Sequence, residues 1–256
     1  MLIPRVMPCL LVKKDRLVKT IRFKSPSYVG DPVNAIKIYN EKEVDELIIL
    51  DINATIERRK PNFELISEVA SECFMPVCYG GGISSIDEIK KLFGLGIEKV
   101  SVNSQSFNNL DLIYQSAKAF GSQSIIVSMD VKKAIFSKYR ICTHSGNKTT
   151  KMGPGEYAKM VENAGAGEIL LNSIDRDGTW DGFDIDLIKL VTNVANIPVI
   201  VLGGAGKLSD ISDAVHKGGA SAVGHGSMAV YQGKNLGVLV NFPSRQKLIE
   251  IFGRIQ

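Results

Sequence analysis

Residues 76–89 read PVCYGGGISSIDEI, and residues 198–211 read PVIVLGGAGKLSDI. Each stretch passes from a short apolar run through paired glycines into an amphipathic pattern, which is the order strand, turn and helix. The same offset of 122 residues pairs Glu46 with Glu168, Leu65 with Leu187, and Val69 with Val191. Chance hydrophobic periodicity would not keep glycines and prolines in step over such a distance, so we interpret the chain as an internal duplication.

Eight short apolar runs, each bounded by turn residues, alternate with helical patterns along the chain. The runs lie near residues 6–12, 47–51, 77–80, 99–103, 125–130, 169–173, 199–203 and 222–225. Ser85 and Glu88 have the spacing of a helix capping box. Eight strand-then-helix units in roughly 250 residues predict an α/β fold, the (β/α)8 TIM barrel. We expect one domain over residues 1–256, built from two homologous half-barrels at about residues 1–120 and 121–245.

The composition is that of an ordinary globular protein, with 45% hydrophobic and 23% charged residues. No apolar run is long enough to span a bilayer, and residues 1–12 do not resemble a signal peptide, so we expect a cytoplasmic protein without membrane contact. The net charge of +4 is too small to predict a nucleic-acid partner. Four cysteines without CxxC or metal-ligand spacing predict reduced thiols, and we expect neither a metal nor a cofactor: Cys9, Cys73, Cys78 and Cys142.

A basic segment follows the first predicted strand, with only Asp15 opposing six cations. The cations are Lys13, Lys14, Arg16, Lys19, Arg22 and Lys24. Two interpretations fit this segment: a solvated loop, or a mobile basic lid over an anionic ligand.

In (β/α)8 barrels the C-terminal strand ends and the loops after them form the active face. Here those ends read GGG at residues 80–82, NS at 103–104, GGAG at 203–206 and HGS at 225–227. Glycine lets backbone N–H groups approach an anion, and a helix N-terminus adds partial positive charge. The loops after strands seven and eight are the usual phosphate site of this fold, and the duplication predicts a second site after strands three and four. We therefore predict a ligand with two anionic groups.

Four carboxylates also follow strands at the active face: Asp51, Asp130, Asp175 and Asp177. Each of them serves either as a general acid or base, or as a cap or ion-pair partner for a neighbouring loop.

The opposite face carries a second charged set, at the beginnings of strands one, two, four and six. Its members are Arg5, Glu46, Lys99 and Glu168. Charges on this face predict a ring of ion pairs that stabilises the barrel.

Several long motifs resemble one known family. They are PCLLVKK with Lys19, DELIILDINAT, the GGGI turn, KVSVNS, VSMDVKK, GAGEILLNSIDRDGT and PVIVLGGAGK. Together they resemble the cyclase subunit of imidazole glycerol phosphate synthase, from about residue 1 to residue 230. The resemblance implies that ammonia from a partner glutaminase passes through the barrel and is added to a two-phosphate substrate at the active face.

The resemblance also implies roles for individual residues. One phosphate would be held by Gly81, Gly82, Asn103 and Ser104. The other would be held by Gly178, Gly203, Gly204, Gly226 and Ser227. Lys19 would lie in a mobile loop at the substrate, and Asp130 and Asp177 would be the catalytic carboxylates. The charged set at the opposite face looks like the family's entrance for ammonia.

One departure from the family lies in the reacting groups. The family uses an aspartate at the end of strand one and another at the end of strand five. When LVKK at residues 11–14 is aligned with DVKK at 130–133, this chain keeps Asp130 and has Leu11 at the other position. Leucine cannot transfer a proton, and the loss of one positioned acid or base typically costs about 10²–10⁴ in rate. Asn172, Tyr79, Leu202 and His225 are further departures that we expect at the same mouth.

This pattern predicts a paralogue with the same nitrogen supply and a different acceptor. The branch it resembles serves lipopolysaccharide and other surface-polysaccharide biosynthesis, where an acetamido group on a phosphorylated or nucleotide-activated sugar becomes an acetamidino group. One alternative is a true cyclase subunit of histidine biosynthesis, which is a lyase. Another is an inactive barrel that docks to a glutaminase and activates it.

Overall fold

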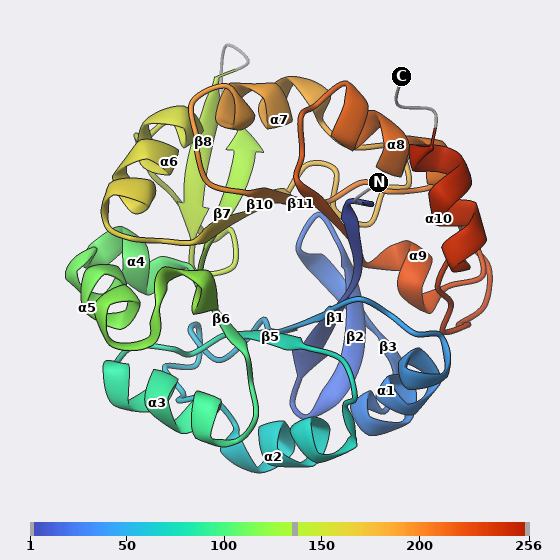
Figure 1. Cartoon of the computed structure of the whole chain (residues 1–256), viewed down its shortest axis with the longest axis horizontal. Coiled ribbons are helices and arrows are strands. Elements are labelled where there is room, and N and C mark those ends of the chain that lie inside the picture. Colours follow the sequence, from blue (N-terminus) through green and yellow to red (C-terminus); the bar gives the residue numbers. More distant parts are fainter. Residues whose placement is uncertain (1–2, 135–137, 254–256) are drawn as a thin grey trace.

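A computed structural model describes residues 3–134 and 138–253. Eight parallel strands form a closed barrel: β1 (Arg5–Lys13), β4 (Leu47–Asp51), β5 (Val77–Gly80), β6 (Lys99–Val102), β7 (Ile125–Lys133), β10 (Glu168–Ser173), β11 (Val199–Leu202) and β12 (Ala222–His225). Each strand pairs with the next in this order, and β12 pairs with β1, so the barrel has no free edge (Figure 1). The predicted (β/α)8 barrel is confirmed.

Helices surround the barrel (Figure 1). They are α1 (Pro32–Glu41), α2 (Phe63–Glu72), α3 (Ile86–Gly94), α4 (Ser104–Asn108), α5 (Asp111–Phe120), the 3-10 turn η1 (Ser122–Ser124), α6 (Pro154–Asn163), α7 (Ile185–Thr192), α8 (Leu208–His216), α9 (Ser227–Val230) and α10 (Arg245–Phe252). Ser85 caps α3 as predicted, since its hydroxyl accepts from the Glu88 N–H at 3.3 Å. The return bond of the capping box is shifted by one residue, because the Glu88 carboxylate accepts from the Ser84 N–H at 2.8 Å.

Two hairpins extend the barrel on its active face. The strands β2 (Arg16–Ile21) and β3 (Lys24–Gly30) follow β1, and β8 (Tyr139–Thr143) and β9 (Lys148–Thr149) follow β7. The expectation that Lys19 lies in a loop is therefore wrong. The segment at residues 16–21 pairs with β1 and β3, and its buried side chains, Leu17, Lys19 and Thr20, order it as a strand.

The barrel interior is filled by alternate residues of the strands, since successive side chains point to opposite faces. This interior cluster consists of Met7, Cys9, Ile48, Cys78, Ile126, Leu170, Ile200, Leu202 and Ala222, with Leu11 and Leu50 packed against it. The intervening residues, such as Val6, Leu47 and Val77, pack outward against the helices in the main core. This alternation decides which residues at the strand ends can face a bound ligand.

Candidate active site at the barrel mouth

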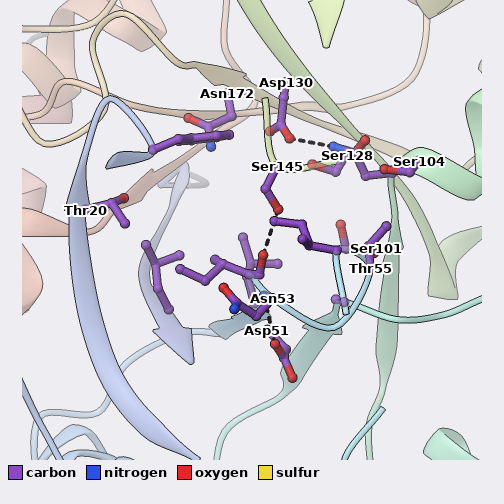
Figure 2. Close-up of a pocket in the computed structure, with 18 of the residues that line it drawn as sticks. Thr20, Asp51, Asn53, Thr55, Ser101, Ser104, Ser128, Asp130, Ser145 and Asn172 are labelled. Carbon is purple, nitrogen blue, oxygen red and sulfur yellow. Dashed lines mark hydrogen bonds between the residues drawn. The ribbon is translucent and has the colours of Figure 1, made fainter. Parts of the chain in front are cut away.

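A cavity of about 590 Å3 lies at the C-terminal ends of the barrel strands. Its lining comes from both predicted halves of the chain and from both hairpins (Figure 2). All of the residues predicted for the two anion sites border it: Gly81, Gly82, Asn103, Ser104, Gly178, Gly203, Gly204, Gly226 and Ser227. Lys19, Asp130 and Asp177 border it as well. The structure thus brings the predicted site residues of this face together in one space.

Asp130 is the buried carboxyl group at the floor of the cavity, and Asn103 is its hydrogen-bond partner. The Asn103 amide donates to Asp130 Oδ2 at 2.8 Å. Burial raises the pKa of Asp130 to about 7, the hydrogen bond from Asn103 opposes that shift, and the nearby Asp177 adds to it. A carboxyl group that titrates near neutral pH can take up or release a proton during a reaction.

The floor has a polar wall and an apolar wall. Leu11, Leu50 and Leu202, on β1, β4 and β11, border the cavity on one side. Ser101 and Asn172, on β6 and β10, flank the strand that carries Asp130. Within the described residues, the Ser101 hydroxyl and the Asn172 amide oxygen are buried without a hydrogen-bond partner. Buried polar atoms are costly unless a ligand or water satisfies them, so this wall is suited to a polar group of a ligand.

Two of the four residues expected to alter the mouth, Tyr79 and His225, direct their side chains away from the cavity. Tyr79 follows Cys78, an interior residue, so its side chain packs outward in the helix-facing core. His225 borders the cavity, but its ring stacks on Phe242 in the helix-facing core, with 5.8 Å between the ring centroids. Complete burial lowers the pKa of His225 to about 4, so the ring is neutral. Of the four expected departures, only Asn172 and Leu202 shape the cavity floor.

The glycine turns after β5 and β11 both contain glycines with positive φ. Gly81 and Gly203 follow β5 and β11 with φ of 119° and 91°, in the region that favours glycine. A Cβ on Gly81 would lie 2.4 Å from the Asp51 carbonyl oxygen, and one on Gly203 would lie 2.5 Å from that of Ser173. These glycines are therefore required by close backbone packing at the cavity rim, whether or not an anion binds there.

Lys19 and Asp177 form a buried ion pair at the cavity wall. Lys19 Nζ donates to Asp177 Oδ1 at 2.7 Å and to the Thr20 carbonyl at 2.7 Å. The other carboxylate oxygen accepts from the Thr20 hydroxyl at 2.8 Å. Asp177 is thus bonded to the β2–β3 hairpin, although 158 residues separate it from Lys19.

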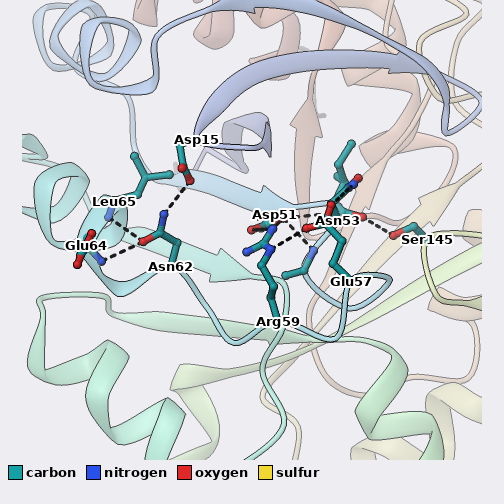
Figure 3. A network of polar contacts seen from close by, with 11 residues as sticks. Asp15, Asp51, Asn53, Glu57, Arg59, Asn62, Glu64, Leu65 and Ser145 are labelled. Atoms are coloured by element: carbon teal, nitrogen blue, oxygen red, sulfur yellow. Dashed lines mark hydrogen bonds and ion pairs between the residues drawn. The ribbon is translucent and has the colours of Figure 1, made fainter.

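The remaining two carboxylates hold loops together. Asp51 Oδ1 accepts from the backbone N–H groups of Asn53 and Ala54 at 3.0 Å, and the Arg59 guanidinium pairs with Asp51 at 3.1 Å (Figure 3). Asp175 accepts from the Lys133 N–H at 2.7 Å. Asp51 therefore pairs with a cation of the following loop, as the second alternative expects, and Asp175 binds the backbone at the end of β7.

The four charges at the opposite end of the barrel form the predicted ring. Arg5 pairs with Glu46 at 2.5 Å and with Glu168 at 2.8 Å. Lys99 pairs with the same two carboxylates at 3.1 and 2.9 Å. Each charge therefore has two partners of opposite sign, and the ring closes the lower end of the apolar interior.

The sequence matches the family model described as histidine biosynthesis protein over residues 5–235. The chain belongs to this family. It is 50% identical over 244 residues to a Pseudomonas aeruginosa protein provisionally named imidazole glycerol phosphate synthase subunit hisF2, covering 95% of this chain and 97% of that protein. It is 44% identical to a Vibrio vulnificus protein provisionally named subunit hisF3, covering 98% of each chain. It is also 46% identical over 206 residues to imidazole glycerol phosphate synthase subunit HisF of Sulfolobus acidocaldarius, covering 80% of this chain and 82% of that protein.

Some residues that border the cavity were not predicted from the sequence of this family member. Ser101, Ser128 and the turn of the second hairpin at His144 and Ser145 all border the cavity. The two serines could have been found from the strand alternation that places Asn103 and Asp130 inward. The turn residues left no such signal, because only the folded hairpin brings them to the mouth. Among the described residues, no helix is long and apolar enough to cross a bilayer, and no cluster of His, Cys, Asp and Glu is placed to hold a metal.

Proposed function

We propose that this protein is the acceptor-binding subunit of a glutamine amidotransferase. It takes ammonia from a partner glutaminase and adds it to a phosphate-bearing acceptor, a nucleotide-activated sugar of surface-polysaccharide biosynthesis whose acetamido group becomes an acetamidino group. The two proteins work as a heterodimer in the cytoplasm.

The cavity floor is the observation that carries the proposal. Asp130 is present with a pKa near neutrality, while Leu11 occupies the end of the first strand and borders the same space. A floor with one carboxyl group opposite a leucine supports one proton transfer and packs against an apolar part of the acceptor. An acetamido group offers both a methyl face and a polar amide edge, which matches the two walls of the floor.

Phosphate recognition rests on the paired turns. The glycine turns after β5 and β11 lie beside the starts of α4 and α9, where Asn103 and Gly226 are the capping residues. Backbone N–H groups at such turns, with Lys19 and Ser227 beside one of them, suit the anionic groups of the acceptor.

The partner is inferred from the ring of Arg5, Glu46, Lys99 and Glu168 and from the relatives, whose names describe them as subunits. The reaction replaces the amide oxygen by nitrogen, so that oxygen must first be activated as a leaving group. The chain has no P-loop motif, so we assign any ATP-dependent activation to another protein.

A cyclisation assay separates the proposal from its main alternative, a cyclase subunit of histidine biosynthesis. The purified barrel is given the histidine-pathway substrate and free ammonia at high pH, so that no glutaminase is needed. We expect turnover at least about 10²-fold below that of an ordinary cyclase subunit, because only Asp130 remains to move a proton. Turnover like that of an ordinary cyclase would overturn the proposal. Sedimentation with the cognate glutaminase should show a 1:1 complex that releases little ammonia to solvent.

The main alternative is the histidine-pathway cyclase itself. It is favoured by identities of 46% and 44% to the subunits named from Sulfolobus acidocaldarius and from a Hydrogenobaculum species, which lie in the same range as those to the provisionally named relatives. An inactive docking barrel would show the glutaminase complex and no nitrogen transfer to any acceptor.

A further inference from the structure

The two hairpins reach across the mouth, and each contacts the half of the barrel to which it does not belong. The turn of β2–β3 meets the loop after β10, where the Arg22 N–H donates to the Asp177 carbonyl at 2.8 Å. The turn of β8–β9 meets the loop after β4, where the Ser145 hydroxyl donates to the Ile52 carbonyl at 2.7 Å. The His144 N–H donates to the Ser104 hydroxyl at 2.8 Å. The contacts of the second hairpin therefore mirror those of the first.

Both turns place non-glycine residues in the left-handed backbone region. Arg22 and Phe23 have φ of 51° and 62°, and His144 and Ser145 have φ of 55° and 54°. This conformation is unfavourable for such residues and persists where surrounding contacts hold it. At the first turn those contacts come mainly from Asp177.

Asp177 has both carboxylate oxygens occupied by donors of the first hairpin. Oδ1 accepts from Lys19, and Oδ2 accepts from Thr20 and from the Phe23 N–H at 3.4 Å. Its own backbone carbonyl accepts from Arg22. Four residues of one hairpin thus bond to one aspartate, whereas Asp130 has a single amide partner, Asn103.

Lys19 is held beside the turn that begins α9. A Cβ on Gly226 would lie 3.0 Å from Lys19 Cε, so the lysine side chain packs closely against this turn. The ammonium group has three donors and uses two of them, toward Asp177 and the Thr20 carbonyl. The third donor is left for an anion bound at Gly226 and Ser227, which border the same cavity.

We propose that Asp177 is a positioning residue: it fastens the β2–β3 hairpin across the mouth so that Lys19 of the first half-barrel completes the anion site of the second. This inference rests on the anion sites of the proposed function. It assigns Asp177 to anion binding through Lys19, and leaves proton transfer to Asp130.

The experiment uses inorganic phosphate as the probe and backbone amide NMR as the readout. Shifts of Gly204 and Ser227 report the second site, and shifts of Gly82 and Ser104 report the first site in the same sample. The variants are Asp177→Ala, Thr20→Val and Lys19→Met. Asp181→Asn is the matched control, because Asp181 lies in the same loop and its one ion pair among the described residues is with the exposed Lys234.

The sign of the effect separates positioning from simple electrostatics. Removing a negative charge from the mouth would by itself tighten phosphate binding. Positioning predicts the reverse: Asp177→Ala weakens phosphate at the second site about tenfold or more, as Lys19→Met does, and leaves the first site unchanged. Thr20→Val gives a smaller loss, and Asp181→Asn gives none. The Phe23 amide should exchange with solvent at least about tenfold faster in Asp177→Ala, because its acceptor is gone.

Unchanged or tighter phosphate binding in Asp177→Ala overturns the proposal, and so does weaker binding with an unchanged Phe23 amide. Wild-type protein that binds no phosphate at the second site also overturns it, since Lys19 then completes no anion site. The proposed function is judged separately by the glutaminase complex and by nitrogen transfer. Loss of phosphate shifts at the first site in a variant would indicate a folding defect, and in that case Thr20→Val, which keeps every charge, decides by the same two readouts.

Discussion

At the lower end of the barrel, four charged side chains each have two partners of opposite sign, and the ring they form is closed. At the upper end, Asp130 has one amide partner and, within the described residues, no ion pair. The neighbouring Ser101 and Asn172 there keep buried oxygen atoms without any partner. Among the described residues, the same barrel therefore pairs all four charges at one end, where the buried Glu46 Oε1 still accepts no hydrogen bond, and leaves neutral polar groups without any partner at the other.

This difference indicates that the lower end of the barrel serves stability and that the upper end serves reactivity. A ring in which every charge has two partners of opposite sign holds the strand ends together. An unsatisfied wall costs folding free energy, and such a cost is typical of sites kept ready for a substrate.

The largest effect is expected from Asp130→Asn at the upper end. Nitrogen transfer by the complex should fall by about 10²–10⁴, because Asp130 is the carboxyl group left to transfer a proton and Leu11 cannot replace it. The measurement is acceptor-dependent incorporation of labelled amide nitrogen from glutamine, with Asp181→Asn as the matched control. An Asp130→Asn complex with more than a tenth of wild-type activity would contradict the role.

The pH dependence of unfolding in the same variant should show how much free energy the burial of Asp130 costs. Burial raises the pKa of Asp130 to about 7, whereas an unfolded aspartate titrates near 4. Between these values the folded protein keeps a proton that the unfolded chain has lost, so the free energy of unfolding falls as pH rises from about 4 to about 7. Asp130→Asn lacks this term, and its stability relative to wild type should rise across that window by up to about 4 kcal/mol. Urea unfolding at a series of pH values measures the difference, and a constant difference would be inconsistent with a buried acid.

Glu46→Gln removes one carboxylate charge from the ring at the lower end. Arg5 and Lys99 keep Glu168 as a partner but lose the almost fully buried Glu46 carboxylate, and we expect a loss of about 1–3 kcal/mol in urea unfolding. Glu72→Gln in the exposed Lys37 pair is the control and should change stability by less than about 0.5 kcal/mol. If the ring is also the ammonia entrance, the variant complex should release more ammonia per glutamine hydrolysed. Equal losses for the two variants would show that the ring adds nothing to an ordinary surface pair.

Phe74→Ala tests whether the lower end of the barrel binds the glutaminase. Phe74 precedes β5 at the lower face, and 87% of its surface is exposed. Exposed aromatic residues often anchor protein interfaces, so Phe74→Ala should weaken glutaminase binding about 10–30-fold without changing stability. Calorimetric titration gives the dissociation constant. Tyr114→Ala, on α5 at the side of the barrel, is the control and should leave the affinity unchanged.

The smallest effect is expected from Leu11→Asp, which restores a second carboxylate at the upper end. Turnover of the histidine-pathway substrate should rise only a few fold, because Asn172 and Leu202 still shape the floor and, on the proposed function, fit it to a different acceptor. The assay is ammonia-dependent cyclisation at high pH. Recovery to the rate of an ordinary cyclase would show that position 11 alone separates the two activities.

Much of this architecture is predictable from local patterns. The eight barrel strands fall at the eight apolar runs, because alternation and turn residues are encoded within a few positions of each strand. The charged ring was predictable too, since Arg5 and Glu168 stand at strand starts where side chains of one face converge. The hairpins were missed because the polar strand β3 has few buried residues and resembles a loop in sequence. Tyr79 was misplaced because its direction depends on strand alternation relative to Cys78, whereas His225 borders the cavity as expected but turns its ring toward Phe242.

By itself the sequence determined the order of strands and helices and the glycine turns, and it shows Leu11 where the matching motif has Asp130, because each is a property of neighbouring residues. Only the tertiary structure decided what each carboxylate does. Asp51 and Asp175 bind nearby loops, Asp177 binds a hairpin from the other half, and Asp130 is left almost alone in a buried space. The physical reason is that burial and pairing set the chemistry of a carboxyl group, and both depend on residues far away along the chain, such as the 158 positions that separate Lys19 from Asp177.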